Sequence, residues 1–164
     1  MDKRSDKDQL NQLSLEILRA FDHVQQNARK IFQKTASDHN LSIPQLVLLT
    51  KLAPQIEMTQ KELGKETQLP KSTLSQAVDG LVLAGLIHRH PVEDNRREMQ
   101  LILSEKGKEF FDTIWFQKGS IHHAFECALR TFTEKQSEDF LAALRQIALF
   151  LEKEITEQGE CSNG

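Results

Sequence analysis

Groups able to recognise a polar or charged surface are concentrated between Thr59 and Gly107. One short run carries an amine, three hydroxyls and an amide, at Lys71, Ser72, Thr73, Ser75 and Gln76. Guanidinium groups follow it, at Arg89, Arg96 and Arg97. Hydroxyls and amides can meet hydrogen-bond donors and acceptors, and arginine suits a narrow groove of negative potential. The chemistry on offer is therefore recognition by hydrogen bonds and charge.

Two short helices joined by a tight turn are predicted to position the first run. Thr59 and Glu62 form a capping box, in which each side chain satisfies a free backbone donor at a helix start. Pro70 stops this helix because proline cannot continue one, and a second helix is expected over residues 71–83. Its apolar side chains share one face at helical spacing, at Leu74, Val78, Leu81 and Val82. The polar run then lies on the outer face, at a size that fits the major groove of DNA.

A change of period after Gly85 predicts a β-hairpin. Residues 86–90 read as a short strand, 91–95 as a turn and 98–103 as a returning strand whose alternation is imperfect at Ile102. Arg96 and Arg97 stand where the hairpin turns back. An arginine on a protruding hairpin can enter the minor groove of DNA. The hairpin is therefore interpreted as the wing of a DNA-binding domain.

The segment with these features resembles the winged helix-turn-helix of the MarR family of bacterial transcription regulators. The matching text is TQKELGKETQLPKSTLSQAVDGLVLAGLIHRHPVEDNRREMQLILSEKG, with STLSQAVDGL, AGLIHR, an Asp/Arg wing and an L-S-x-x-G exit. Local similarity covers about a third of the chain. The resemblance implies a mainly α fold with a small antiparallel β-hairpin wing, flanked by N- and C-terminal dimerisation helices. It also implies regulation of transcription by a homodimer that binds double-stranded DNA.

Two positions in the second helix depart from the family pattern. Similar proteins often carry arginine where Gln76 and Gly80 stand in this chain. Base preference and phosphate contacts are therefore expected to differ here.

The register of the wing stays open. The family pairs an aspartate with an arginine two residues later. Counting back from Gly107 places this pair at Asn95 and Arg97, whereas Asp94 and Arg96 keep the spacing one residue earlier. Both arginines are therefore assigned to DNA.

Apolar stripes on either side of this segment predict long helices. In the first, apolar residues recur every seventh position, at Leu10, Ile17, Val24 and Ile31, with Phe21 and Ala28 between them. A stripe of this kind more often packs inside its own chain than against a partner, so the homodimer rests on the resemblance. Two protomers would present two recognition helices to a pseudo-palindromic operator.

Capping signals mark the other helices. Ser42 and Gln45 form a second capping box for a helix that ends before Pro54. Ser104 is expected to cap a long helix bent near Gly119 and Ser120, and a third capping box, Thr133 with Gln136, opens the final helix. The expected organisation is an N-terminal dimerisation helix in 1–38, the DNA-binding domain in 42–107, C-terminal dimerisation helices in 108–158 and a disordered tail in 159–164.

Composition limits the possible classes. A net charge of −3 argues against indiscriminate adhesion to nucleic acid, although a local basic face is enough for DNA binding. The N-terminal residues lack the apolar core of a signal peptide, and no apolar run is long enough to span a membrane. A cytoplasmic location and reduced thiols at Cys127 and Cys161 are expected. The sequence contains no phosphate loop, nucleophile elbow or H-E-x-x-H pair, so no enzyme and no cofactor are predicted.

A metal-responsive regulator is one alternative. His123 and Cys127 lie four residues apart on an expected helix and can share a face, but two ligands do not make a site. His39 and Cys161 are conceivable further ligands. No metal is predicted. Peroxide sensing of the kind some MarR-like proteins perform uses a cysteine early in the first helix, where this chain has none.

The predicted function is a dimeric repressor released from its operator by a small ligand. Proteins that it resembles often bind small aromatic acids where the DNA-binding domain meets the dimerisation helices. In this chain that junction is expected near Phe32, Phe111 and Trp115. A protein-interaction module that keeps the fold without binding DNA remains a second alternative.

Overall fold

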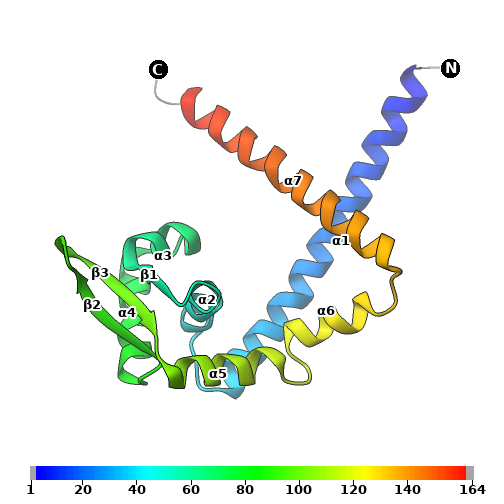
Figure 1. Ribbon diagram of the computed structural model, residues 1–164. Helices are drawn as coiled ribbons and strands as arrows, with labels where there is room; N and C mark the ends of the chain where they lie inside the picture. Colours follow the sequence, from blue (N-terminus) through cyan, green and yellow to red (C-terminus); the bar gives the residue numbers. More distant parts are fainter. Residues whose placement is uncertain (1–2, 162–164) are drawn as a thin grey trace. The chain divides into compact units, whose positions relative to one another are not determined.

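The computed structural model shows a mainly helical chain with one small sheet. It describes residues 3–161, except for the side chains of residues 3–6, 96 and 158–161. The elements are α1 Lys3–Asp38, α2 Ile43–Leu52, β1 Glu57–Thr59, α3 Gln60–Thr67, α4 Lys71–Leu83, β2 Ile87–Val92, β3 Asn95–Leu103, α5 Glu105–Phe116, α6 Ile121–Leu129 and α7 Glu134–Cys161 (Figure 1). The chain divides into two compact units, one through His123 and one from Ala124 onward. The predicted fold class is confirmed.

The sheet has three antiparallel strands in the order β1-β3-β2. Glu57 pairs with Ile102 on one side of β3, and Ile87 pairs with Leu103 on the other. The predicted hairpin is therefore present, but β1 was not predicted. A strand of three residues is too short to show an alternating pattern, and its partner lies more than forty residues later in the chain.

The hairpin formed by β2 and β3 is called the wing from here on. Its turn is tighter than predicted. Only Glu93 and Asp94 form it, because β2 continues through Val92 and β3 begins at Asn95. Pro91 fits within β2 because β2 is an edge strand, where a missing backbone donor costs little. The pairing shifts register between Pro91 and Val92.

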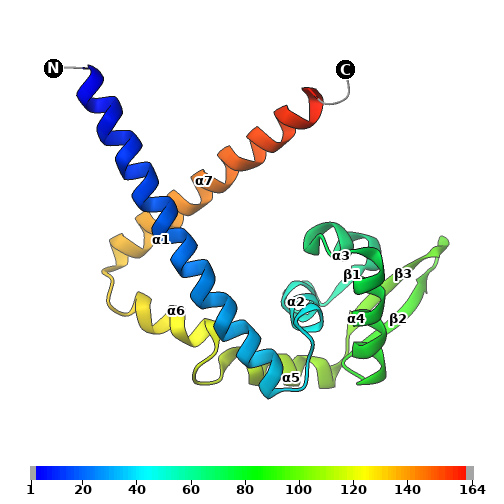
Figure 2. The same ribbon diagram turned by 180° about the vertical axis from the view of Figure 1, so that it is seen from behind.

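Helices α2, α3 and α4 pack together and against the sheet, as the reverse view shows (Figure 2). The core between them consists mainly of leucine, with the side chains of Leu48, Leu49, Leu52, Leu63 and Leu81 fully buried. Burial of one such side chain stabilises the fold by about 1.5–3 kcal/mol. The predicted capping box at Ser42 and Gln45 begins α2, and α2 ends at Leu52, before Pro54.

The long bent helix predicted after Ser104 is wrong: two helices stand in its place. Helix α5 ends at Phe116 and α6 begins at Ile121, with Gly119 between them at φ 85°. The buried Ser120 hydroxyl donates to the Trp115 carbonyl at 2.6 Å and accepts from the His123 N–H at 3.1 Å. Ser120 therefore acts as a cap that starts α6, rather than as a bend within one helix.

Apolar side chains are exposed along α1, at Leu10, Leu13, Ile17, Phe21 and Val24. The same is true of α7, at Phe140, Leu144, Ile147, Leu151 and Ile155. The predicted capping box of Thr133 and Gln136 is present at the start of α7. Within residues 3–161, no helix has the length and apolar character needed to cross a membrane. A tail was expected over residues 159–164, but α7 continues through Cys161 and so includes the first part of that range. Residues 162–164 lie outside the described residues.

The start of α5 meets the end of α4 at close range. Ser104 caps α5 by accepting the Gly107 N–H at 2.9 Å, and its hydroxyl donates to the Gly85 carbonyl at 2.7 Å. A Cβ atom on Gly107 would lie 2.0 Å from the carbonyl oxygen of Leu86. Since that oxygen belongs to the backbone, a side chain at position 107 can be accommodated only if the two segments separate.

We therefore expect Gly107→Ala to lower the free energy of unfolding by about 2 kcal/mol, the typical cost of overpacking a core. Urea unfolding at fixed protein concentration measures this change. Glu109→Ala is the matched control, because Glu109 is exposed on the same helix. Equal unfolding midpoints for the two variants would contradict the prediction.

Candidate nucleic-acid interface

A reciprocal cap fixes the start of α3. The Thr59 N–H donates to the Glu62 carboxylate at 2.8 Å, and the Glu62 N–H donates to the Thr59 hydroxyl at 3.1 Å. The Thr59 hydroxyl also donates to this carboxylate, at 2.9 Å. The backbone bond from Thr59, and then the bond from its hydroxyl, stabilise the ionised form and lower the pKa of Glu62. The helix ends at Gln68, which adopts the left-handed conformation at φ 53° before Pro70 begins the next turn.

Close packing sets α4 against α3. A Cβ atom on Gly64 would lie 3.1 Å from the Leu74 side chain, so glycine permits the two helices to approach each other. Helix α4 spans the predicted residues, and its buried face consists of Leu74, Ala77, Val78 and Leu81. The burial of this face turns the polar run outward.

The structure places the predicted polar run at the start of α4. Lys71, Ser72 and Gln76 are exposed, and Thr73 and Ser75 are half-buried. Pro70 occupies the N-cap and supplies no side-chain hydrogen bond. The helix start therefore has no side-chain cap, and its first backbone amides are available to an anion.

Arg89 has a protein partner in the structure. Its guanidinium donates to the carboxylate of Asp79 at 2.7 Å, which links β2 to the middle of α4. Asp79 is exposed one turn beyond Gln76, so the ion pair neutralises a negative charge on the side of α4 that carries the polar run. The prediction that Arg89 contacts DNA stays a prediction, and the geometry gives Arg89 this neutralising role as well.

Asn95 organises the start of β3, next to the turn of the hairpin. Its side-chain oxygen accepts the N–H of Arg97 at 3.3 Å, and its amide donates to Glu98 at 3.5 Å. Arg97 is exposed, whereas the side chain of Arg96 lies outside the described residues. Of the two registers considered, the pairing of Asn95 with Arg97 is therefore the one whose side chains the structure describes.

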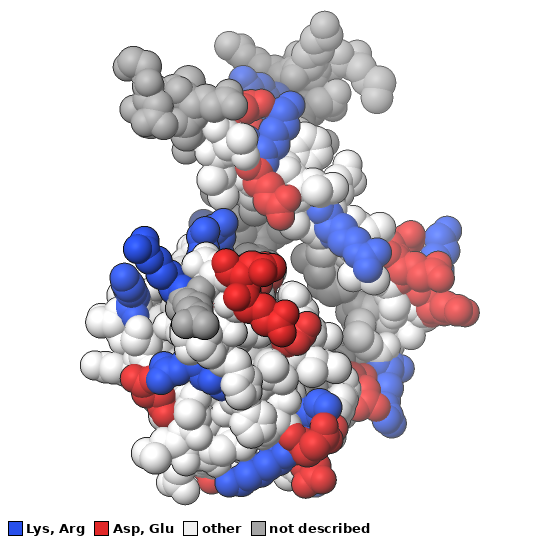
Figure 3. Space-filling model, turned by 60° about the vertical axis from the view of Figure 1, so that its left-hand side comes forward, with Lys and Arg blue, Asp and Glu red and all other residues white. Residues whose placement is uncertain are grey.

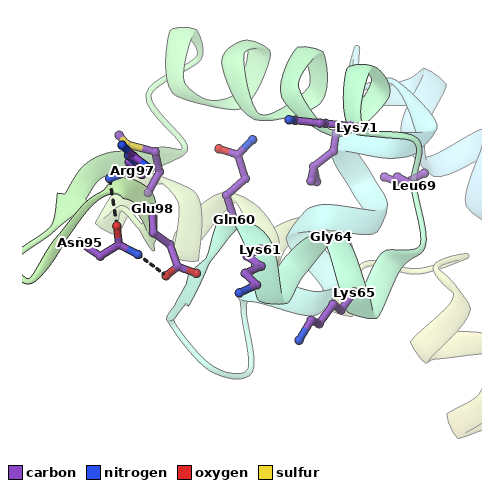
Figure 4. A pocket seen from close by; sticks show the side chains of 11 residues that line it. Gln60, Lys61, Gly64, Lys65, Leu69, Lys71, Asn95, Arg97 and Glu98 are labelled. Atoms are coloured by element: carbon purple, nitrogen blue, oxygen red, sulfur yellow. Dashed lines mark hydrogen bonds between the residues drawn. The ribbon is translucent and has the colours of Figure 1, made fainter.

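A groove separates α3 and the start of α4 from β3, with a volume of about 700 Å³ (Figure 4). It is lined by Gln60, Lys61, Gly64, Lys65, Leu69, Lys71, Leu74, Asn95, Arg97, Glu98 and Met99. The predicted Lys71 and Arg97 are thus brought together. The α3 residues of this lining were not predicted, although the spacing of Lys61 and Lys65 places both on one side of a helix that the capping box had already located.

A second cavity, of about 390 Å³, lies between α1, the start of α2 and the segment from α5 to α6. It is lined by Ala28, Arg29, Phe32, Gln33, Ile43, Trp115 and Ile121. Two of the three aromatic residues predicted for a ligand site therefore line one cavity. Phe111 stacks on Trp115 at a ring-centroid distance of 5.3 Å but does not line the cavity itself.

The candidate metal ligands do not form a cluster among the residues whose side chains are described. No group of three or more histidine, cysteine or acidic residues in that part of the chain is arranged to hold a metal ion. The ring of His39 bonds to the Gln117 amide, and the side chain of Cys161 lies outside the described residues. His123 accepts the Gly119 N–H at 3.4 Å through its ring nitrogen.

Comparison with known proteins identifies the winged segment. Residues 41–99 match the model of the MarR family. These residues form a MarR-family domain. Over 139 residues the chain is 24% identical to an uncharacterised HTH-type transcriptional regulator of Bacillus subtilis (strain 168), YybA, covering 85% of this chain and 91% of the relative. The family consists of transcription regulators rather than enzymes.

Solved structures show the same fold. A MarR family protein from Bacillus stearothermophilus superposes with a TM-score of 0.70 at 20% identity, covering 93% of this chain and 99% of that one. The structure of NadR in complex with 4-hydroxyphenylacetate gives a TM-score of 0.66 at 15% identity, covering 80% of this chain and 92% of that one. The chain therefore has the winged-helix fold of MarR-family regulators.

The cap of α3 leads to a pH prediction. Because the pKa of Glu62 is lowered in the folded protein, its contribution to stability is present above the unfolded value of 4.5 and is lost as pH falls through the folded pKa. We expect wild-type protein to unfold at a slightly higher temperature than Glu62→Gln at pH 6, and this difference to shrink as the pH is lowered below 4.5. Glu66→Gln, an exposed change on the same helix, is the control. A gap between wild type and Glu62→Gln that is constant with pH would contradict the prediction.

Proposed function

We propose that this chain is a DNA-binding transcription regulator that acts as a dimeric repressor. In this proposal it occupies a pseudo-palindromic operator and is released by a small aromatic acid. The observation that carries the proposal is the MarR-family winged helix with an exposed polar run at the uncapped start of α4, beside a groove whose charged lining residues are four cations and one carboxylate.

The recognition helix α4 enters the major groove of DNA. Ser72 and Gln76 are exposed on its first two turns and are the best placed to meet base edges. Lys71 and the free backbone amides of the first turn bind phosphate, and Thr73 and Ser75 contribute through their partly exposed hydroxyls. The wing carries Arg97, together with Arg96, into the adjacent minor groove. These assignments rest on the side chains near α4 and the wing rather than on the overall charge, which is −3. Basic and acidic side chains are interspersed over the face shown in Figure 3.

A homodimer would place two such helices on one operator. Support comes from the apolar side chains exposed along α1 and α7, for which burial against a second copy is the simplest source of stability. The N-terminal helix and the helices after residue 108 are accordingly proposed as dimerisation elements, and 42–107 as the DNA-binding domain. In a two-fold dimer the half-site centres lie about one helical turn of DNA apart.

The cavity beside Trp115 suits a small aromatic acid. Its walls are mostly apolar, and Arg29 is the cation among the residues that line it. An aromatic ring would lie among Phe32, Ile43 and Trp115, while its carboxylate pairs with Arg29. That NadR binds 4-hydroxyphenylacetate on the same fold supports this ligand class. Such a ligand releases DNA only if it binds the DNA-incompetent conformation more tightly.

The DNA proposal is tested by gel shift and salt titration on DNA from upstream of the chain's own gene. We expect Arg97→Ala to weaken binding to all sequences and to reduce the salt dependence by about one phosphate contact. Gln76→Ala should instead cost about 1–3 kcal/mol on the preferred sequence and relax the preference at one base position. Lys51→Ala, an exposed change that does not line the groove, is the control. A protein-interaction module would show no salt-dependent DNA binding in any variant.

The ligand proposal is tested through the fluorescence of Trp115, the single tryptophan of the sequence. We expect 4-hydroxyphenylacetate and related aromatic acids to change this fluorescence and to raise the melting temperature. Arg29→Ala should weaken binding of the acid about tenfold or more, since it removes a charge-assisted hydrogen bond, and should leave binding of the neutral amide analogue largely unchanged. Arg19→Ala, farther along α1, is the control. The absence of any response in wild-type protein would refute this ligand class.

A further inference from the structure

Two lysines on α3, Lys61 and Lys65, line the groove beside the wing without belonging to the recognition helix. We infer that this groove binds the sugar–phosphate backbone of one DNA strand, and that these lysines are phosphate-binding residues. The inference rests on the proposed function and deepens it, because it names which part of the DNA lies against α3.

The geometry of α3 holds the two lysines in place. They are four residues apart, so they lie on one side of the helix about 6 Å apart along its axis. Both are exposed, and Figure 4 shows both side chains extending from the same side of α3. The capping box at Thr59 fixes where the helix begins, and the burial of Leu63 fixes how it is rotated. The lysines are therefore presented to the groove by a rigid element.

The charge of the lining favours an anion. Four cations, Lys61, Lys65, Lys71 and Arg97, line the groove together with one carboxylate, Glu98. The whole chain, in contrast, carries a net charge of −3. Lysine is a compact charge on a flexible stem, which suits phosphate, and contacts to phosphate carry no sequence information.

The position of the groove identifies which anion binds there. One wall is formed by α3 and the start of α4, and the other by Asn95, Arg97 and Glu98, in the part of β3 that follows the turn of the wing. If α4 lies in the major groove and the wing in the minor groove, the strand that separates these two DNA grooves must pass between the two protein elements. The groove is the space available to that strand.

A hydrogen bond between α3 and α4 gives the contacts with the DNA backbone a further effect. The Gln60 side-chain amide donates to the Ser75 hydroxyl at 3.5 Å, which joins the first residue of α3 to the polar run of α4. Phosphates bound next to Gln60 by Lys61 would therefore set how deeply and in which register α4 enters the major groove. Phosphate contacts position a protein on DNA in this way without reading sequence.

The decisive experiment measures DNA affinity over a range of salt concentrations for full-length wild type, K61A/K65A and the matched control K51A/K118A. We expect the slope of log K against log salt to become shallower by about 1.8 for K61A/K65A, since each phosphate contact contributes about 0.9. Affinity at 150 mM salt should fall about ten- to thirtyfold on specific and non-specific DNA alike, which leaves the ratio between them unchanged. The control lysines are exposed and do not line the groove, so that variant should match wild type.

A second variant tests the groove without removing a cation. E98Q deletes the carboxylate opposite the lysines and should tighten DNA binding. Exposed lysine-to-alanine changes on a helix should leave the melting temperature unchanged, which separates a lost contact from a lost fold. An unchanged salt slope in K61A/K65A, or an equal loss in the control, overturns the inference while the proposed function stands. If wild-type protein binds no double-stranded DNA, the proposed function fails and the inference fails with it.

Discussion

The burial of one face of α4 is the constraint on which the candidate interface depends. Leu74, Val78 and Leu81 are removed from water among the leucines of α2 and α3, so rotating α4 about its axis would expose several apolar side chains at once. Such a rotation would cost several kcal/mol, more than any single surface contact returns. The outward position of Ser72 and Gln76 therefore follows from packing on the opposite side of the helix, and no surface interaction is needed to hold them there.

The C-terminal end of α4 is held by hydrogen bonds from side chains to its backbone carbonyls, as well as by packing. The Lys106 amine donates to the Ala84 carbonyl at 2.7 Å, and Ser104 joins the Gly85 carbonyl to the start of α5. These bonds satisfy carbonyl groups that a helix end otherwise leaves to water. Trp115 lies near the other end of α5, so a ligand in the proposed cavity and the end of the recognition helix share one rigid helix. In the proposed ligand response, a small displacement of α5 reaches α4 through these contacts.

Local signals predicted most of the fold, because their partners lie within four residues. The capping boxes at Thr59 and at Ser42 both form, and α4 has the predicted bounds. Features that depend on distant partners were missed or misjudged. Strand β1 exists only because β3 pairs with it. Ser120 starts a new helix, and its hydroxyl reaches back to the Trp115 carbonyl in the helix before. The same holds for the site. Lys71 was predicted from the pattern of its own helix, whereas Lys61 becomes a candidate only because the wing lies beside it and forms the other wall of the groove.

If the chain binds DNA as proposed, a cationic groove on a chain of net negative charge affects how it searches along DNA. Non-specific affinity depends on how many phosphates the protein neutralises, and distant negative charges oppose every binding mode alike. Two acidic groups near the groove differ in their surroundings. Asp79 is paired with Arg89, whereas Glu98 lines the groove. In the proposed complex, attraction would be strongest where α4 and the wing are seated on DNA together. In the proposed complex, DNA that does not reach the groove lacks the attraction of its four cations, so the groove would favour the docked complex over loosely bound states.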